Sequence, residues 1–327
     1  VAIFQVFDEV RKDESARSRR FNVALDVAHP CAGIVAQAWE AIDAVLMQCI
    51  VDCGTMEVAC KAVKYMVATM QKHARPLLPV LLQKLVACFH EAPHSCFLYL
   101  SATMVNVFGG SSEAADQAAL DDVLVNFTQR LCADGGLLCN EENFSTMPDV
   151  VEDFFEFAAR YCRYCPALIL HRRPELMAGI STCGMKGLGC GHRQATRSLL
   201  DFYDRALALG VDERKYGAEA IAAQRPAIQG VFRPIGEQLV GKLLQGIAGG
   251  LPYDRCREAG VVLFSLRQCF ATAGTCDADA WIFNALSALP AARYTNEKKQ
   301  EYMAQLQVAG DAKAVKNVLQ AIASTAG

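Results

Sequence analysis

Residues 56–74 have the sequence MEVACKAVKYMVATMQKHA, and the spacing of their apolar residues decides the fold class. At about 100° per residue, the apolar side chains fall on one side of a helix and the lysines on the other. The apolar side holds Ala59, Val63, Met66, Val67 and Met70. Apolar residues recur at three and four throughout the chain, and no long alternating segment predicts a sheet. We therefore expect an all-α protein.

Outward from this stretch, the same period predicts helices along the whole chain, with Pro or Gly at most of the breaks. The predicted ranges are 2–10, 31–52, 56–74, 76–91, 94–108, 114–133, 147–165, 167–187, 192–209, 216–248, 254–273, 276–289, 296–308 and 311–324.

Neighbouring helices pair into hairpins that begin near residues 31, 76, 114, 167 and 216. This spacing of about 40–50 residues is typical of HEAT-type arrays, in which each hairpin buries its apolar faces against the next. We predict one α-solenoid of antiparallel helical hairpins over residues 1–327, with a polar inter-helix loop at 9–30. Two separate α-helical domains are the alternative.

The composition excludes several classes of protein. Hydrophobic residues make up 53% of the 327 residues, which is too apolar for a disordered chain. The net charge of −3 excludes a globally basic nucleic-acid-binding protein. The longest stretch without a formal charge, 92–112, contains Pro93, His94, two glycines and four serines, so it predicts a buried helix rather than a membrane span. We expect no direct contact with nucleic acid or membrane.

The cysteines indicate the compartment. All 15 are scattered, odd in number and mostly beside Ala, Val or Leu, as buried free thiols are. They predict a reduced, cytosolic or nuclear protein. The sequence starts inside an apolar run that includes Phe4 and Phe7, without an initiating Met, so we expect a fragment of a longer protein.

Several motifs resemble the C-terminal portion of one family, the transportin-3/importin-13 branch of the importin-β-type (karyopherin-β) nuclear transport receptors. The most specific is HSCFLYL at 94–100. The others follow in order along the chain: His29-Pro30-Cys31 before a helix that carries Trp39, EQLVGKLL at 237–244 with its Leu251-Pro252 stop, and WIFNALSALP at 281–290. The matches therefore extend over most of the chain.

The resemblance implies a HEAT-repeat solenoid that carries cargo proteins through nuclear pores under control of the GTPase Ran. It implies no cofactor, and a receptor that shuttles between cytoplasm and nucleus. Ran and nucleoporins would be partners of the full-length receptor. Because the main Ran contacts of that family lie in N-terminal repeats, this stretch alone is not expected to bind RanGTP tightly.

Four cations share one face of the predicted helix at 56–74 and its end. Lys61, Lys64, Lys72 and Arg75 fall within about 80° of one another, opposite the apolar side. Like charges at this spacing repel each other in the absence of a partner, so this basic face predicts an anionic partner. A simply solvated face is the alternative.

The resemblance makes that partner more specific. In the resembled family, the helix at this place carries a row of arginines that receives the phosphorylated Arg-Ser domains of splicing factors. Lys61 and Lys64 occupy arginine positions, whereas Val58 and Ala68 replace two others. Lysine lacks the bidentate fork of N–H donors that suits phosphate, so this chain has a weakened version of the family's basic site.

A second helix, predicted at 147–165, has the opposite charge. Its acidic stripe consists of Asp149, Glu152, Asp153 and Glu156, and its other side is apolar. Such a stripe predicts a surface for basic cargo segments. Solvation, together with the favourable placement of acids near a helix start, is the alternative.

Neither a metal site nor an active site is predicted. Cys162 and Cys165 have the spacing of structural zinc ligands, with Cys183, Cys190 and His192 nearby, but the first pair lies on an apolar helical face. Buried thiols are therefore the preferred interpretation. No nucleophile–base arrangement or phosphate loop is evident, so we expect a protein that is not an enzyme.

Three functions compete. The first is the cargo-binding arch of a nuclear transport receptor. The second is a generic HEAT-repeat scaffold, and the third is a regulatory subunit that assembles other proteins. Period and composition do not separate them; only the family-like motifs favour the first. The polar segment at Arg17–Arg20 has two interpretations, an exposed loop between helices or a loop that senses phosphate.

Overall fold

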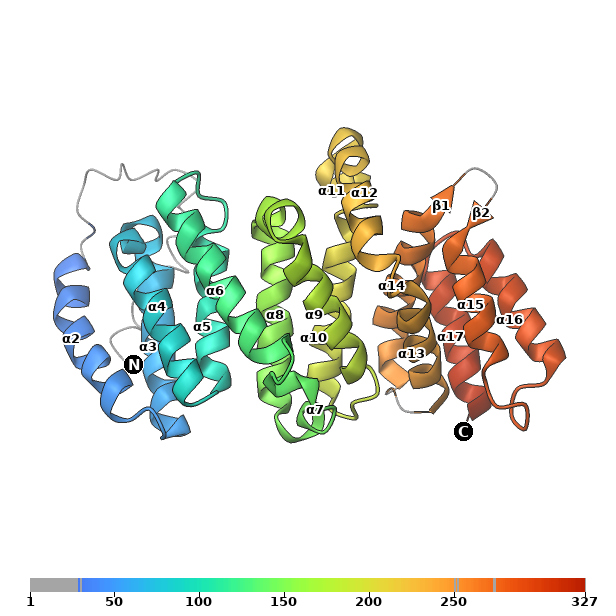
Figure 1. The fold of residues 1–327 in the computed structure, drawn as a ribbon, viewed down its shortest axis with the longest axis horizontal. Coiled ribbons are helices and arrows are strands. Elements are labelled where there is room, and N and C mark those ends of the chain that lie inside the picture. Colours follow the sequence, from blue (N-terminus) through green and yellow to red (C-terminus); the bar gives the residue numbers. More distant parts are fainter. Residues whose placement is uncertain (1–28, 30, 250, 252, 273–274, 327) are drawn as a thin grey trace. The chain divides into compact units, whose positions relative to one another are not determined.

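The computed structural model describes residues 29 and 31–326, except 250, 252, 273 and 274. Helices dominate these ranges (Figure 1), so the all-α prediction is confirmed. Three predictions lie outside the described residues: the helix at 2–10, the segment at Arg17–Arg20, and the loop at 9–30 except for His29.

The contacts within the chain divide it into two compact units, Val1–Arg130 and Leu131–Gly327. The boundary falls inside a helix, α6. The first unit contains α2 (Ala32–Gln48), α3 (Cys53–Met70), the 3₁₀ helix η2 (Gln71–Leu77), α4 (Leu78–Glu91), α5 (Ser95–Phe108) and most of α6 (Ala114–Cys132). The predicted single array over 1–327 stays a prediction.

The second unit holds the remaining elements. They are η3 (Leu137–Cys139), α7 (Asn143–Thr146), α8 (Pro148–Tyr164), the π-helix η4 (Leu168–Arg172), α9 (Pro174–Gly187), α10 (Arg193–Ala208), α11 (Glu213–Tyr216), α12 (Ala218–Phe232), α13 (Gly236–Gly249), η5 (Tyr253–Arg255), α14 (Cys256–Phe270), β1 (Ala271–Thr272), β2 (Thr275–Cys276), α15 (Asp277–Ser287), α16 (Asn296–Val308) and α17 (Ala312–Ala326).

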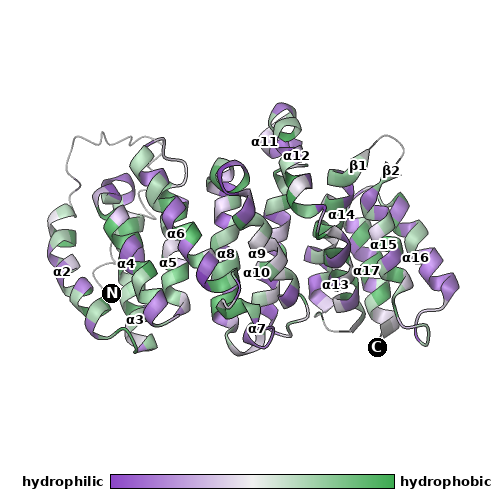
Figure 2. Ribbon diagram, in the orientation of Figure 1, coloured by the Kyte–Doolittle hydropathy of each residue, from purple (hydrophilic) through white to green (hydrophobic). Residues whose placement is uncertain are grey.

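In both units, several helices pack on the next helix but one. In the first unit α3 packs on α5, and in the second unit α8 packs on α10 and α13 packs on α15. Stacked helical hairpins produce this pattern, because the equivalent helices of successive hairpins lie side by side. Individual helices accordingly carry both apolar and polar residues (Figure 2). Each unit is therefore a helical stack of the HEAT/TPR type.

Aromatic side chains fill the core between stacked helices. Phe89 of α4 and Phe127 of α6 lie with their ring centroids 5.2 Å apart in the first unit. In the second unit, Phe155 of α8 and Phe202 of α10 lie 5.7 Å apart. All four side chains are fully buried. Edge-to-face contacts of this kind add to the free energy of apolar burial.

Several helices end earlier than predicted. The predicted helix at 216–248 is two helices, α12 and α13, because Pro234 lies between them and lacks the N–H that a continuous helix needs. The predicted helix at 167–187 is divided in the same way before Pro174. The short helices α7 and α11 were not predicted.

Two short strands interrupt the helical pattern. β1 and β2 pair antiparallel, with Ala271 opposite Cys276, and form one small ladder between α14 and α15. The predicted helix at 254–273 therefore ends at Phe270. In the part of the chain that the structure describes, no helix is long and apolar enough to cross a membrane.

Candidate functional site

Helix α3 carries the first candidate surface. Asp52 caps its start, because the Asp52 carboxylate accepts the N–H of Gly54 at 3.2 Å. The apolar side predicted from the sequence is buried, from Ala59 through Met70. Since polar residues occupy the opposite side, the two-faced character of this helix is confirmed over Cys53–Met70.

The exposed side of α3 holds Lys61 and Lys64, one helical turn apart. The ammonium nitrogen of Lys64 lies 5.3 Å from the ring centroid of Tyr99, which belongs to the neighbouring helix α5. This distance is within the range of a cation–π interaction. The Tyr99 hydroxyl donates a long hydrogen bond of 3.5 Å to the backbone carbonyl of Glu57. One aromatic side chain of α5 thus contacts α3 at two points.

The four predicted cations do not lie on one continuous helix, because α3 ends at Met70. Gln71 follows with φ 51° and ψ −127°, a backbone conformation that is rare for any residue other than glycine. The chain then continues as the 3₁₀ helix η2, which carries Lys72 and Arg75. These two cations therefore lie on another element than Lys61 and Lys64, although Lys72 is exposed.

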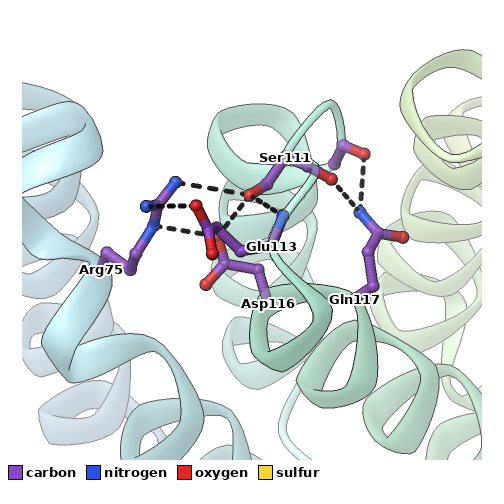
Figure 3. A network of polar contacts seen from close by, with 6 residues as sticks. Arg75, Ser111, Glu113, Asp116 and Gln117 are labelled. Atoms are coloured by element: carbon purple, nitrogen blue, oxygen red, sulfur yellow. Dashed lines mark hydrogen bonds and ion pairs between the residues drawn. The ribbon is translucent and has the colours of Figure 1, made fainter.

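Arg75 is engaged within the first unit, in the network of Figure 3. Its Nε lies 3.0 Å from Oδ2 of Asp116, and its Nη1 lies 3.5 Å from Oε1 of Glu113. The Ser111 hydroxyl donates to the same Asp116 oxygen at 2.6 Å, and Gln117 donates to two backbone carbonyls of this loop. The Asp116 side chain is only 3% exposed. Arg75 therefore neutralises a buried carboxylate and ties η2 to the start of α6.

An open groove of about 600 Å³ lies between α2 and α3. Its walls are mostly apolar and include Ile42 and Val45 of α2 and Val58 and Ala62 of α3. Val58 is 53% exposed and contributes to this apolar wall.

Helix α8 carries the acidic stripe. It begins with Pro148 at its first turn, a position that needs no N–H, and Asp149 follows where a negative charge complements the helix dipole. The apolar side is confirmed, because five predicted side chains are fully buried: Val151, Phe154, Phe155, Ala158 and Cys162. This burial fixes α8 against α10 and leaves the stripe on the other side.

Glu156 and Glu152 of the acidic stripe interact with other side chains of the second unit. Glu156 forms an ion pair with Arg160, one turn further along α8. Burial raises the pKa of Glu152, and the charge of Asp149 adds to this effect, whereas His192 of the turn before α10 lowers it. Part of the stripe's charge is therefore compensated internally, and its role in binding cargo stays a prediction.

The cysteines considered for zinc are buried thiols, and His192 has a structural role. Burial raises the pKa of Cys162 and of Cys165 to about 12, which favours neutral thiols over the thiolate that a metal requires. His192 instead caps α10, since its Nδ1 accepts the N–H of Ala195 at 3.3 Å. Among the described residues, no group of three His, Cys, Asp or Glu side chains is arranged to hold a metal ion. The four thiols are buried, as predicted: Cys162, Cys165, Cys183 and Cys190.

Two residues of the first unit were not singled out from the sequence. Tyr99 lies inside the motif at 94–100, where Cys96, Phe97 and Leu98 are core residues and Tyr99 reaches the backbone of α3 with its hydroxyl. Asp116 is a buried carboxylate on a helix that looks solvated in the sequence. Only the packing of neighbouring elements reveals either role.

Comparison with known proteins gives one family model and several relatives. Residues 29–133 match the model of the fourth TPR domain of transportin-3/importin-13. Transportin MOS14 of Arabidopsis thaliana is 25% identical over 256 residues, which are 78% of this chain and 25% of that protein. Importin-13 of Bos taurus is 22% identical over 281 residues, 85% of this chain and 27% of that protein. Importin-13 of Homo sapiens is 21% identical over the same length. The chain thus spans about a quarter of the length of the curated relatives it matches.

Proposed function

Because these matches confirm the similarity to the transportin-3/importin-13 branch of the importin-β-type receptors, we propose that this chain is the cargo-binding part of a nuclear transport receptor. In this proposal the full-length protein shuttles between cytoplasm and nucleus. It also contacts Ran and nucleoporins, and it releases cargo under the control of Ran. The chain itself binds cargo proteins, not nucleic acid or membrane.

One observation carries the proposal for the site. The segment that matches the family model includes all of α3, whose exposed side presents Lys61 and Lys64. An anionic cargo segment fits this surface, and a phosphorylated Arg-Ser segment is the candidate taken from the resemblance. Each phosphoserine brings a charge of about −1.5 to −2 and three acceptor oxygens, so each lysine can bind one phosphate. Exposed ion pairs contribute only about 0.2–1 kcal/mol, so we expect weak and salt-sensitive binding.

The acidic stripe of the second unit supports a separate proposal, a contact with a basic cargo segment. Asp149 and Asp153 stand on one side of α8 with Glu152 and Glu156, and arginine side chains of a cargo segment complement that charge. Because Glu156 already pairs with Arg160, we assign most of this contact to the start of the helix. A stripe that is only solvated would leave binding unchanged when Asp149 and Asp153 become lysine.

The test of the basic site is peptide binding followed by fluorescence anisotropy at moderate salt. We expect a phosphorylated Arg-Ser peptide to bind and its unphosphorylated form to bind much less. Replacing Lys61 and Lys64 by Glu should weaken binding about two- to thirty-fold, because two surface ion pairs are lost. Helical circular dichroism should not change, since both side chains point away from the buried side.

Lys72 provides the matched control. It is also exposed, but it lies on η2 beyond the turn at Gln71. Lys72→Glu changes the net charge by the same amount per residue and should have a much smaller effect. Equal losses from all three substitutions would mean that only the overall charge matters. No loss from Lys61→Glu and Lys64→Glu together would leave α3 a solvated face.

A generic scaffold or regulatory subunit is the competing function. Affinity capture with the full-length protein, with and without RanGTP, separates them. We expect RanGTP to release a set of proteins from a transport receptor. A scaffold retains the same proteins under both conditions.

A further inference from the structure

The contact between Lys64 and Tyr99 joins two stacked helices of the first unit. The Lys64 ammonium lies 5.3 Å from the ring centroid of Tyr99, and α3 and α5 pack along their length. The ring is fixed mainly by the helix that carries it. Its backbone lies in a helix whose adjacent residues Leu98 and Leu100 are fully buried, and its hydroxyl reaches the Glu57 carbonyl. A rigid aromatic surface therefore lies under a flexible cation.

Lysine needs such support to bind an anion well. Its flexible four-carbon stem has many rotamers, and this freedom is lost when the ammonium is fixed on a partner. A ring face that already attracts the ammonium reduces the loss on binding. The ammonium has three N–H donors, so contact with the ring leaves donors for a phosphate oxygen.

We infer that Tyr99 is a positioning residue of the cargo site: its ring holds the Lys64 ammonium in place for an anionic group of the cargo. This inference rests on the proposed function of α3. It adds Tyr99 of α5 to the site. It also makes Lys64, whose ammonium the ring supports, a stronger phosphate contact than its neighbour Lys61. The Tyr99 hydroxyl is not needed for this role.

Two substitutions of Tyr99 separate the ring from the hydroxyl. Tyr99→Phe keeps the aromatic face and loses only the long hydrogen bond to Glu57, so the phosphorylated Arg-Ser peptide should bind it as it binds the unaltered chain. Tyr99→Leu keeps an apolar side chain without a ring. We expect it to weaken binding about two- to fivefold, the size of an exposed cation–π interaction. The dependence of binding on salt should stay the same, because no charge is removed.

A double-mutant cycle tests whether the effect acts through Lys64. In a Lys64→Ala background, Tyr99→Leu should change binding no further, because the ring then has no ammonium to hold. An equal loss in both backgrounds would show that Tyr99 contacts the cargo directly or only supports the fold. Tighter binding by Tyr99→Leu would show that the ring competes with the cargo for Lys64. Each of these two results overturns the inference.

A measurement without cargo separates this inference from the proposed function. After reductive ¹³C-methylation of the lysines, the Lys64 signal is identified by its absence in Lys64→Ala. We expect the Tyr99 ring current to shift this signal upfield in the unaltered chain and in Tyr99→Phe, but not in Tyr99→Leu. An unshifted signal in the unaltered chain overturns the positioning role. A shifted signal in a chain that binds no phosphorylated peptide instead overturns the cargo proposal, and the role of Tyr99 in binding with it.

Discussion

Arg75 and Lys61 have the same charge, but their surroundings differ. Arg75 lies 3.0 Å from a carboxylate oxygen of Asp116, which is almost fully buried, whereas Lys61 is exposed on α3. A cation that neutralises a buried acid is not free to leave it, because the acid would then remain charged and desolvated. At the scale of single residues, the neighbouring carboxylate decides which basic side chains are available to a partner.

We therefore expect Arg75→Ala to affect stability rather than binding. It removes the ion pairs to Asp116 and Glu113, and the free energy of unfolding should fall by about 1–3 kcal/mol, a value discounted because Arg75 is partly exposed. Urea unfolding measures this loss. Lys72→Ala is the control and should change the free energy by less than about 0.5 kcal/mol. A similar small change for Arg75→Ala would show that the network of Figure 3 carries no net stability.

The buried thiols predict a loss of stability in alkali. Burial raises the pKa of Cys162 and Cys165 to about 12 and that of Cys269 to about 11, from 9.0. Because the folded pKa values lie above the unfolded ones, this contribution is fully present below pH 9.0 and is lost as the pH rises towards 12. Each thiol should cost about 1.4 kcal/mol of unfolding free energy per pH unit above 9. Urea unfolding on both sides of that pH measures the slope, which should become shallower in Cys162→Ala. An unchanged slope would contradict the prediction.

At the scale of elements, helices can pack closely where a glycine at the contact has no side chain. Gly187 ends α9 against α7 and α10, and a Cβ there would lie 2.6 Å from Cε1 of Phe144 and 2.8 Å from Cδ1 of Leu199. Both of these side chains are buried, so neither can move aside easily. The missing side chain at Gly187 is thus part of the core packing.

Two glycines on the same helix give a matched pair of variants. Gly187→Ala should lower the free energy of unfolding by about 1–3 kcal/mol, the usual cost of overpacking a core. Gly179→Ala, where a Cβ meets nothing within 4 Å, should leave it unchanged or raise it by up to about 1 kcal/mol, since alanine favours the helix. Urea unfolding of the two variants side by side measures the difference. Equal stabilities would mean that α7 or α10 shifts at little cost.

The sequence predicts helices better than their ends. The apolar period of 56–70 suffices to predict α3 and its buried side, because the period alone determines which residues face the core. The end at Met70 coincides with the positive φ of Gln71, a backbone conformation that the apolar period does not encode. Pro234, by contrast, was a visible local signal that α12 and α13 are separate, and the period alone obscured it.

The candidate site was predictable in part for the same reason. Lys61 and Lys64 share a face because they are three residues apart on one helix. Tyr99 is 35 positions further along the chain than Lys64, and only the packing of α3 on α5 brings the two together. The acidic stripe on α8 is predictable from the sequence. In the structure, the ion pair between Glu156 and Arg160 compensates part of the negative charge of that stripe.

At the scale of the whole molecule, the net charge of −3 is spread over two compact units. Exposed cations on α3 are limited to Lys61 and Lys64. Binding to nucleic acid usually requires many lysine and arginine contacts to successive phosphates, and each contact adds to the salt dependence. Two neighbouring cations can bind a short phosphorylated segment but offer little to a long polyanion.

We therefore expect RNA to compete poorly for the basic site. A single-stranded RNA oligonucleotide with the same total charge as the phosphorylated Arg-Ser peptide should displace it only at much higher concentration, because each RNA phosphodiester carries one negative charge and a phosphoserine carries about −1.5 to −2. Competition followed by fluorescence anisotropy measures this difference. The unlabelled phosphopeptide is the reference competitor. Displacement by RNA at equal concentration would show a non-selective anion site.

The spacing of Lys61 and Lys64 has a consequence for how a repetitive cargo would bind. Their Cβ atoms lie about 5–6 Å apart, and alternate residues of an extended chain are about 6.5–7 Å apart, so two successive phosphoserines of an Arg-Ser repeat can face the pair. Every neighbouring pair of phosphates along such a repeat then fits equally well. The number of equivalent registers multiplies the binding constant, and each doubling adds about 0.4 kcal/mol of mixing entropy. A long repeat would bind more tightly than a short one while it continued to slide, and no single alignment would define the complex.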